Sequence, residues 1–118
     1  MKLVKGTLKT LLVLTLLIAG VTSAANKQTA LMTIDLVRAS EETDTAYVRP
    51  VGDVEIKNTS CSYTDLYAIS MSDPNFQTLY ATLLSAAAAK QKVRLWISDN
   101  TGDCLISRQR IRVVDVFY

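Results

Sequence analysis

Hydrophobic and polar residues follow a helical period in the segment that begins at Asp73 and ends near Lys90. Apolar side chains recur there at intervals of three and four residues, at Phe76, Leu79, Tyr80, Leu83, Leu84 and Ala87. This spacing predicts a helix with one buried face. Asp73 and Pro74 are typical of a helix start, because aspartate caps free backbone N–H groups and proline fits the first helical position.

Strand-like alternation of apolar and polar residues follows the helix at residues 93–98 and occurs in four other segments. These are residues 31–38, 46–57, 61–70 and 105–117. The second of the four contains Pro50 and Gly52, where we expect an edge, a bulge or a turn, because proline cannot donate to a strand ladder. The alternation of the last segment slips at Val113 and Val114, which predicts a bulge or two buried faces.

The order of these elements is β-β-β-α-β-β, with the helix after the third strand. We therefore predict a mainly β chain with one helix, folded as a five-stranded OB-fold-like barrel. One such domain fills residues 26–118, and the helix closes one end of the barrel. A generic α+β sandwich is the alternative, because the order of elements does not determine their topology.

Residues 1–25 have the pattern of a secretory signal peptide. Lys2, Lys5 and Lys9 form a positive region, residues 11–19 form a short apolar core, and the small residues at 21–25 suit cleavage after Ala24 or Ala25. A membrane-spanning helix needs roughly 20 apolar residues, so the run is too short for the alternative of a membrane anchor. We therefore expect a secreted or periplasmic bacterial protein with no membrane span.

The positive net charge comes from this leader. The whole chain has 13 basic and 11 acidic residues, and without the three leader lysines ten and eleven remain, a net charge of −1. A nearly neutral domain does not favour binding to the phosphate backbone of nucleic acids. We therefore expect no nucleic-acid partner.

Cys61 and Cys104 are the two cysteines of the chain. An even cysteine count in an exported protein predicts a disulfide. In the chain-entropy model, closing a loop of about 43 residues stabilises a fold by roughly 4 kcal/mol. Two buried free thiols are the alternative.

The chain lacks residues that are common in catalytic sites and metal sites. The chain has no histidine, which removes the commonest general base and the commonest metal ligand. The acidic run at 41–44 and the polar cluster at 99–103 are typical of solvated turns rather than calcium loops. A glycosylation acceptor pattern at 58–60 is also interpreted as a turn. We predict no enzyme activity, catalytic residue, cofactor or metal.

The outer face of the predicted helix is the first candidate site. The chain has no charged residue between Pro74 and Ala89, although a solvated helix face normally carries charge. This favours a subunit interface, and therefore a homo-oligomer, with the small residues Ala81, Ser85 and Ala88 at the contact. A plain alanine-rich surface helix is the alternative, since alanine is the best helix former.

Arg94 and Trp96 are the second candidate site. They lie on the strand face opposite to Val93, Leu95 and Ile97. Arginine and tryptophan are enriched in binding hot spots, so we predict a surface for a ligand or a subunit. Packing of the tryptophan under a neighbouring element is the alternative. Three arginines at alternate positions of the last strand would extend this surface, with a solvated basic strand face as the alternative: Arg108, Arg110 and Arg112.

The sequence FQTLY at 76–80, followed by QKVRLW at 91–96, resembles the helix and following strand of the subtilase cytotoxin B subunit. Cys61 and Ser62 before the helix fit the same pattern. The resemblance implies an exported bacterial OB-fold protein that assembles as a ring pentamer, with the helices around a central pore. It covers about residues 61–97. The N-terminal strand has no clear match to the sugar-binding serine region of that family, and Cys104 has no assigned counterpart.

The same resemblance implies that the ring binds sialylated glycans and carries a catalytic A subunit as a further partner. Together with the residues themselves, it predicts an exported, non-enzymatic binding module of the type of a glycan-binding B subunit of an AB5 toxin. The alternative is a periplasmic structural or interaction protein without a glycan ligand.

Overall fold

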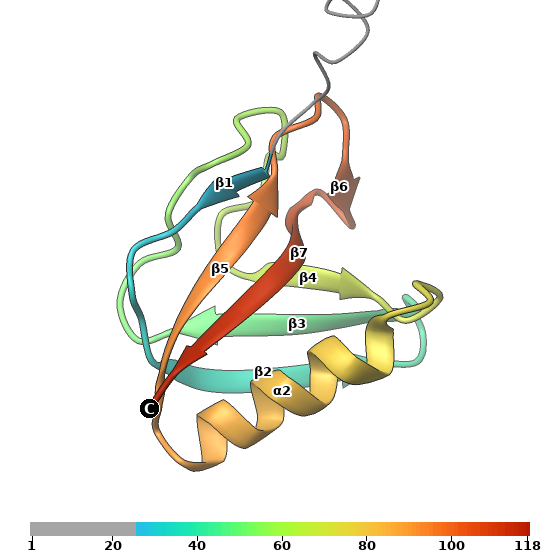
Figure 1. Cartoon of the computed structure of the whole chain (residues 1–118). Coiled ribbons are helices and arrows are strands. Elements are labelled where there is room, and N and C mark those ends of the chain that lie inside the picture. The colour runs from blue at the N-terminus through green and yellow to red at the C-terminus, as the bar shows by residue number, and fades with distance from the viewer. Residues whose placement is uncertain (1–25) are drawn as a thin grey trace, which may run out of the picture.

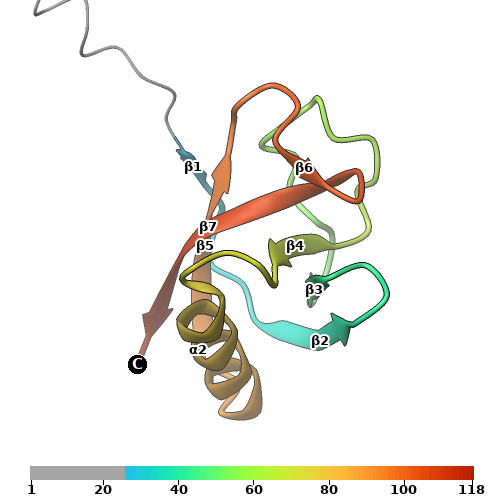
Figure 2. The same ribbon diagram turned by 90° about the vertical axis from the view of Figure 1, so that its right-hand side faces the viewer.

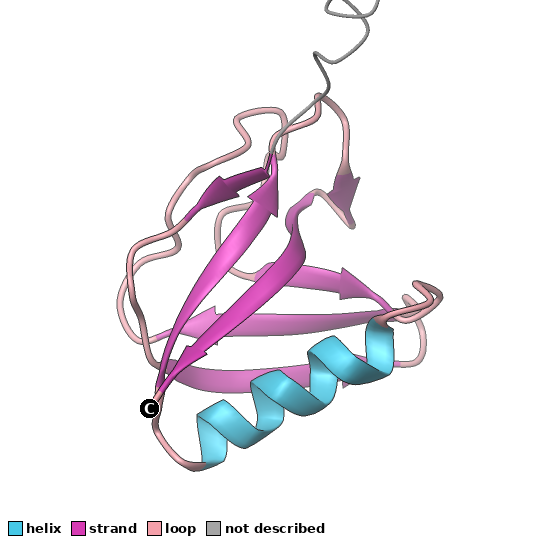
Figure 3. Ribbon diagram, viewed as in Figure 1, coloured by secondary structure: helices cyan, strands magenta, loops and turns pink. Residues whose placement is uncertain are grey.

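A computed structural model describes residues 26–118, and the predicted signal peptide lies outside the described residues. This part of the chain is mainly β with one helix, as predicted (Figures 1 and 3). Its elements are β1 (Asn26–Gln28), β2 (Ile34–Ser40), β3 (Thr45–Pro50), β4 (Tyr67–Ser70), α2 (Phe76–Ala88), β5 (Lys92–Ser98), β6 (Cys104–Leu105) and β7 (Arg108–Phe117).

The strands form a seven-stranded sheet in the order β1-β5-β7-β4-β3-β2, with β6 paired to β7 off this path. Neighbouring strands are antiparallel except β4 and β7, which run parallel with Tyr67 beside Gln109. An isolated bridge joins Met32, just before β2, to Val93 of β5. The sheet is not closed, so the predicted five-stranded barrel is not confirmed.

Two predicted strands are only half as long or less in the structure as in the sequence pattern. The strand predicted at 46–57 ends at Pro50, and Gly52 then takes a φ of 92°, which turns the chain away from the sheet. The strand predicted at 61–70 is reduced to β4. The sheet also contains β1 and β6, which are too short to show any alternation of apolar and polar residues. β1 forms by pairing with β5, and β6 by pairing with β7.

The bulge predicted in the last strand lies one residue before the expected position. Trp96 of β5 pairs with Val113, whereas Ile97 pairs with Ile111, so Arg112 is the extra residue of β7. The bulge changes the phase of β7 and explains the slip in its alternation.

The helix begins later than predicted, and its start has a different chemistry. The residue before it is Asn75, whose side chain makes no capping hydrogen bond. Asp73 contributes its backbone oxygen to the N–H of Phe76 at 3.0 Å, while its carboxylate pairs with Arg110. A charged partner binds a carboxylate more strongly than neutral backbone donors do. The predicted aspartate cap is therefore wrong.

The main core lies between α2 and the inner face of the sheet. Leu83 and Ala86 of the helix are buried against Val48, Tyr67, Ile69, Val93, Leu95, Ile97 and Ile111. Phe76 and Leu79 pack against this cluster as predicted, and Tyr80 stacks on Phe76. Leu84 was expected in the core but is 43% exposed. Figure 2 shows the helix at one end of the sheet, beside β2.

Candidate binding surfaces

Cys61 and Cys104 form the predicted disulfide. Their sulfur atoms are 2.04 Å apart, and the bond joins the loop before β4 to β6. It therefore fixes one end of the sheet, together with hydrogen bonds from the Gly102 N–H to Ser60 Oγ and from the Tyr63 N–H to the oxygen of Ser107.

The loop between β3 and β4 depends on two buried polar residues. Asn58 is 4% exposed, and its side-chain amide donates to the backbone oxygens of Ser98 and Asn100, at 2.9 Å each. Gln109 of β7 is 1% exposed. Asn58 is therefore an internal anchor of a turn, and its amide nitrogen is already occupied.

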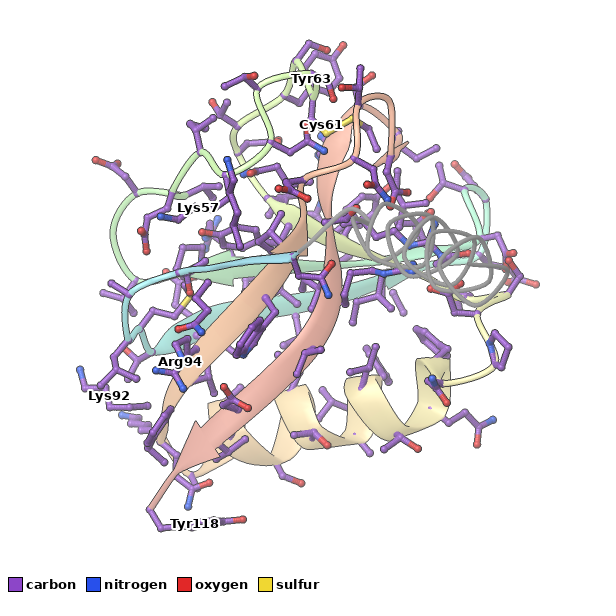
Figure 4. All side chains as sticks on the ribbon, turned by 45° about the horizontal axis from the view of Figure 1, so that its top comes forward. Lys57, Cys61, Tyr63, Lys92, Arg94 and Tyr118 are labelled. Carbon is purple, nitrogen blue, oxygen red and sulfur yellow. A yellow bond between two sulfur atoms is a disulfide. The ribbon has the colours of Figure 1, made fainter. Side chains whose placement is uncertain are left out.

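Arg94 and Trp96 meet at a carboxylate that the sequence pattern did not identify. The indole N–H of Trp96 donates to Oδ2 of Asp115 at 2.7 Å, and Nη2 of Arg94 lies 3.2 Å from the same oxygen. The Arg94 guanidinium also lies over the ring of Phe117, at 5.2 Å from its centroid. All of these residues are on β5 or β7, and Figure 4 shows Arg94 on the outer face of β5.

This arrangement changes the titration of Asp115. The hydrogen bond from Trp96, followed by the bond and charge of Arg94, holds the pKa of Asp115 below its ordinary value. Trp96 and Arg94 are both half-buried. Arg94 and Trp96 thus form a partly exposed surface on which Asp115 compensates the charge of Arg94.

Two of the three arginines on β7 have their own carboxylate partners. Arg108 binds Asp65, and Arg110 binds Asp73 and Asp103. The Nε atom of Arg110 is buried without a hydrogen-bond partner. Arg108 and Arg110 therefore do not present free charge beside Trp96, whereas Arg112 is exposed at the bulge.

The outer face of α2 has the composition that the sequence predicts. Ala81, Ser85 and Ala88 are all exposed, and no residue of the helix is charged. The exposed Leu84 lies among them. The structure thus places these small side chains together on a face that is open to a partner.

A second aromatic cluster was missed by the sequence analysis. The rings of Tyr47 and Tyr63 each lie 5.1 Å from the guanidinium carbon of Arg108. They come from β3 and from the loop after Cys61, so no spacing along the chain relates them. The only signal was the arginine itself, at an alternate position of the last strand.

Residues 26–118 hold no group of three or more side chains placed to bind a metal ion. In the same range, no helix has the length and apolarity needed to cross a bilayer.

Comparison of the chain with models of protein families, with curated protein sequences and with solved structures finds no match in any of the three.

Proposed function

We propose that this protein is an exported, non-enzymatic binding module that works as a homo-oligomer, of the type of a glycan-binding toxin B subunit. The observation that carries this proposal is the exposed, charge-free face of α2, which contains Ala81, Ser85 and Ala88. A helix face of this kind can pack against its copy without burying an unpaired charge.

The arrangement of the strands supports an OB-type fold for this module. Without the short strands β1 and β6, the order is β2-β3-β4-β7-β5, with a parallel β4–β7 pair. The bridge between Met32 and Val93 then relates the two ends of this path, with backbone N–H groups donating in both directions at 2.8 Å. Five strands in one path, with its two ends joined only by a single bridge, are expected of a partly open five-stranded barrel.

The Arg94–Trp96 surface is the site that we assign to the glycan. An indole ring offers a flat apolar face to a sugar ring, and its orientation here is fixed by Asp115. The Arg94 guanidinium beside it supplies N–H donors for ligand oxygens. Sialylated glycans are the first class to test, because the resembling toxin subunits bind them.

A glycan array probed with the mature protein tests this function. We expect binding that Trp96→Ala abolishes and Trp96→Phe retains in part, because phenylalanine keeps a stacking surface. Val51→Ala is the control, because Val51 is 60% exposed and lies just after β3 rather than on β5 or β7. The absence of binding to every glycan would contradict the proposal.

One observation favours a second function, that of a structural or interaction protein without a glycan ligand. The only N–H of the Trp96 indole is already used by Asp115, so the ring has no polar group left for a ligand. Under this function, light scattering still detects an oligomer while the glycan array stays empty.

A further inference from the structure

We propose that Tyr63, together with Ser62 and Asp65, forms a separate binding site for a neutral sugar. The proposal rests on the proposed function in one respect, namely that the protein binds glycans. It places a second site at the opposite end of the sheet from the Arg94–Trp96 surface, and Figure 4 shows Tyr63 near Cys61 and far from Arg94.

Tyr63 provides a large exposed ring that is nevertheless held in place. The residue is 54% exposed, and its ring lies 5.1 Å from the guanidinium carbon of Arg108. Its backbone N–H donates to the oxygen of Ser107 at 2.9 Å. The disulfide at Cys61 restrains the same loop two residues earlier. These contacts restrict the backbone of Tyr63 and place its ring beside Arg108, so that less freedom is lost when a ligand stacks on the ring.

The turn that holds Tyr63 is itself strained. Ile106 and Ser107 connect β6 to β7 with φ angles of 48° and 64°, a region that β-branched residues rarely adopt. Backbone strain of this kind is concentrated at functional sites. Here the backbone oxygens of both turn residues accept hydrogen bonds, from Arg108 and from Tyr63. The turn thus holds Arg108 and Tyr63 next to each other.

Asp65 supplies acceptors beside the ring. Its two carboxylate oxygens accept from Arg108 at 2.9 and 3.0 Å, yet its side chain remains 57% exposed. The bond to Arg108 lowers the pKa of Asp65, so the group is an anion at neutral pH. Each carboxylate oxygen has further lone pairs, which suit neighbouring hydroxyl groups of a sugar.

The size of the site indicates a small ligand. Ser62, Tyr63, Thr64, Asp65 and Arg108 line a hollow of about 330 Å³. Ligand pockets run from about 300 to 1,000 Å³, so this hollow is at the small end. It suits a terminal sugar ring rather than an extended chain.

The charges of the site indicate a neutral ligand. Arg108 uses Nε and Nη2 for Asp65 and Nη1 for the oxygen of Ile106. An anionic ligand, such as a phosphate or the carboxylate of a sialic acid, would therefore be repelled by the Asp65 carboxylate. Arg108 could not offset this repulsion, because it is already bound to Asp65 and to the oxygen of Ile106. A neutral pyranose instead stacks its apolar C–H face on Tyr63 and donates its hydroxyls to Asp65.

Saturation-transfer NMR on the mature protein tests the site with three probes: methyl β-galactopyranoside, methyl β-glucopyranoside and methyl α-mannopyranoside. We expect at least one to bind. Tyr63→Ala should weaken that binding by about tenfold or more, because it removes the aromatic ring that lines the hollow. Tyr63→Phe should retain it. Tyr118→Ala is the matched control, because Tyr118 is fully exposed at the other end of the molecule.

Ser62→Gln tests the site without removing an internal contact. Ser62 is exposed, so the longer side chain occupies the hollow and should also reduce binding. Unchanged affinity in Tyr63→Ala and Ser62→Gln would overturn the proposal, as would failure of all three probes to bind. If Trp96→Ala alone abolishes sugar binding, the proposed function stands and this second site falls. If the array shows no binding of any glycan, glycan binding is contradicted both for the proposed function and for the Tyr63 site.

Discussion

At the scale of single residues, Gln109 is the side chain on which the loop between β3 and β4 depends. Its Oε1 accepts from the backbone N–H groups of Lys57 and Asn58, at 2.6 and 2.8 Å. Its Nε2 donates to the oxygen of Glu55 at 2.8 Å. One buried amide thus satisfies three backbone groups of a segment that forms no strand.

We predict that Gln109→Leu lowers the free energy of unfolding by roughly 2–5 kcal/mol, because each buried polar group left without a partner costs about 1–3 kcal/mol. Urea denaturation followed by Trp96 fluorescence measures the change. Gln77→Leu is the control, because Gln77 is exposed on α2, and it should stay within about 0.5 kcal/mol. A loss below about 1 kcal/mol for Gln109→Leu would show that water replaces the amide.

Asp115 predicts a pH dependence that the single tryptophan of the chain reports. Its pKa is lowered in the folded protein, so its contribution to stability is complete above the ordinary aspartate value of about 3.9 and is lost as the pH falls through the lower, folded value. Protonation weakens the bond to the Trp96 indole. We therefore expect Trp96 emission to change with a midpoint below about pH 3.9.

Asp115→Asn should abolish that fluorescence step. Asp35→Asn is the control, because Asp35 pairs with Arg49 on the β2–β3 side of the sheet, and it should leave the step in place. A midpoint above pH 4 in the unmodified protein would mean that Trp96 and Arg94 do not stabilise the carboxylate.

At the scale of elements, the disulfide joins the loop before β4 to β6, two segments that are far apart along the chain. We predict that replacing Cys61 and Cys104 by alanine lowers the free energy of unfolding by up to about 4 kcal/mol, because the bond closes a segment with a sequence separation of 43. Urea denaturation measures the loss, and a reductant should then have no effect on the variant. Two alkylatable thiols in the unmodified protein before any reductant is added would contradict the bond itself.

The helix and the longer strands were predictable because apolar and polar side chains recur in each of them with a constant period over several residues. The period of Leu79 and Leu83, and that of Val93 and Leu95, reflect burial on one face. The helix start was not predictable, because Asp73 prefers Arg110, a residue far along the chain. Strands as short as β1 have no period of their own and depend on the partner strand.

The same division applies to the candidate sites. Arg94 and Trp96 were identified because both the residue types and their shared face are visible in a single strand. Asp115 and Tyr63 were not identified, because each meets its partner only through pairing or loop packing. Residue type indicates which side chains bind strongly, whereas tertiary structure decides which of them meet.

At the scale of the whole molecule, the outer face of α2 is the surface on which we expect subunits to assemble. This face combines the small residues Ala81, Ser85 and Ala88 with the exposed Leu84. Small side chains allow close approach of two helices, and a head-to-tail contact of this kind closes into a ring when the rotation permits. We therefore predict a homo-oligomer, with a pentamer favoured by the resembling toxin subunits.

Light scattering on the mature protein at micromolar concentration is the first measurement, and a clean monomer would remove the prediction. If an oligomer is found, Ala81→Glu combined with Ala88→Glu should dissociate it, because the added charges repel their symmetry copies at short range. The subunits should stay folded, since glutamate is a good helix former. Thr59→Glu combined with Thr101→Glu adds the same charge at exposed loop positions and should leave the oligomer intact. Dissociation by both double variants would mean that net charge, rather than the α2 face, controls assembly.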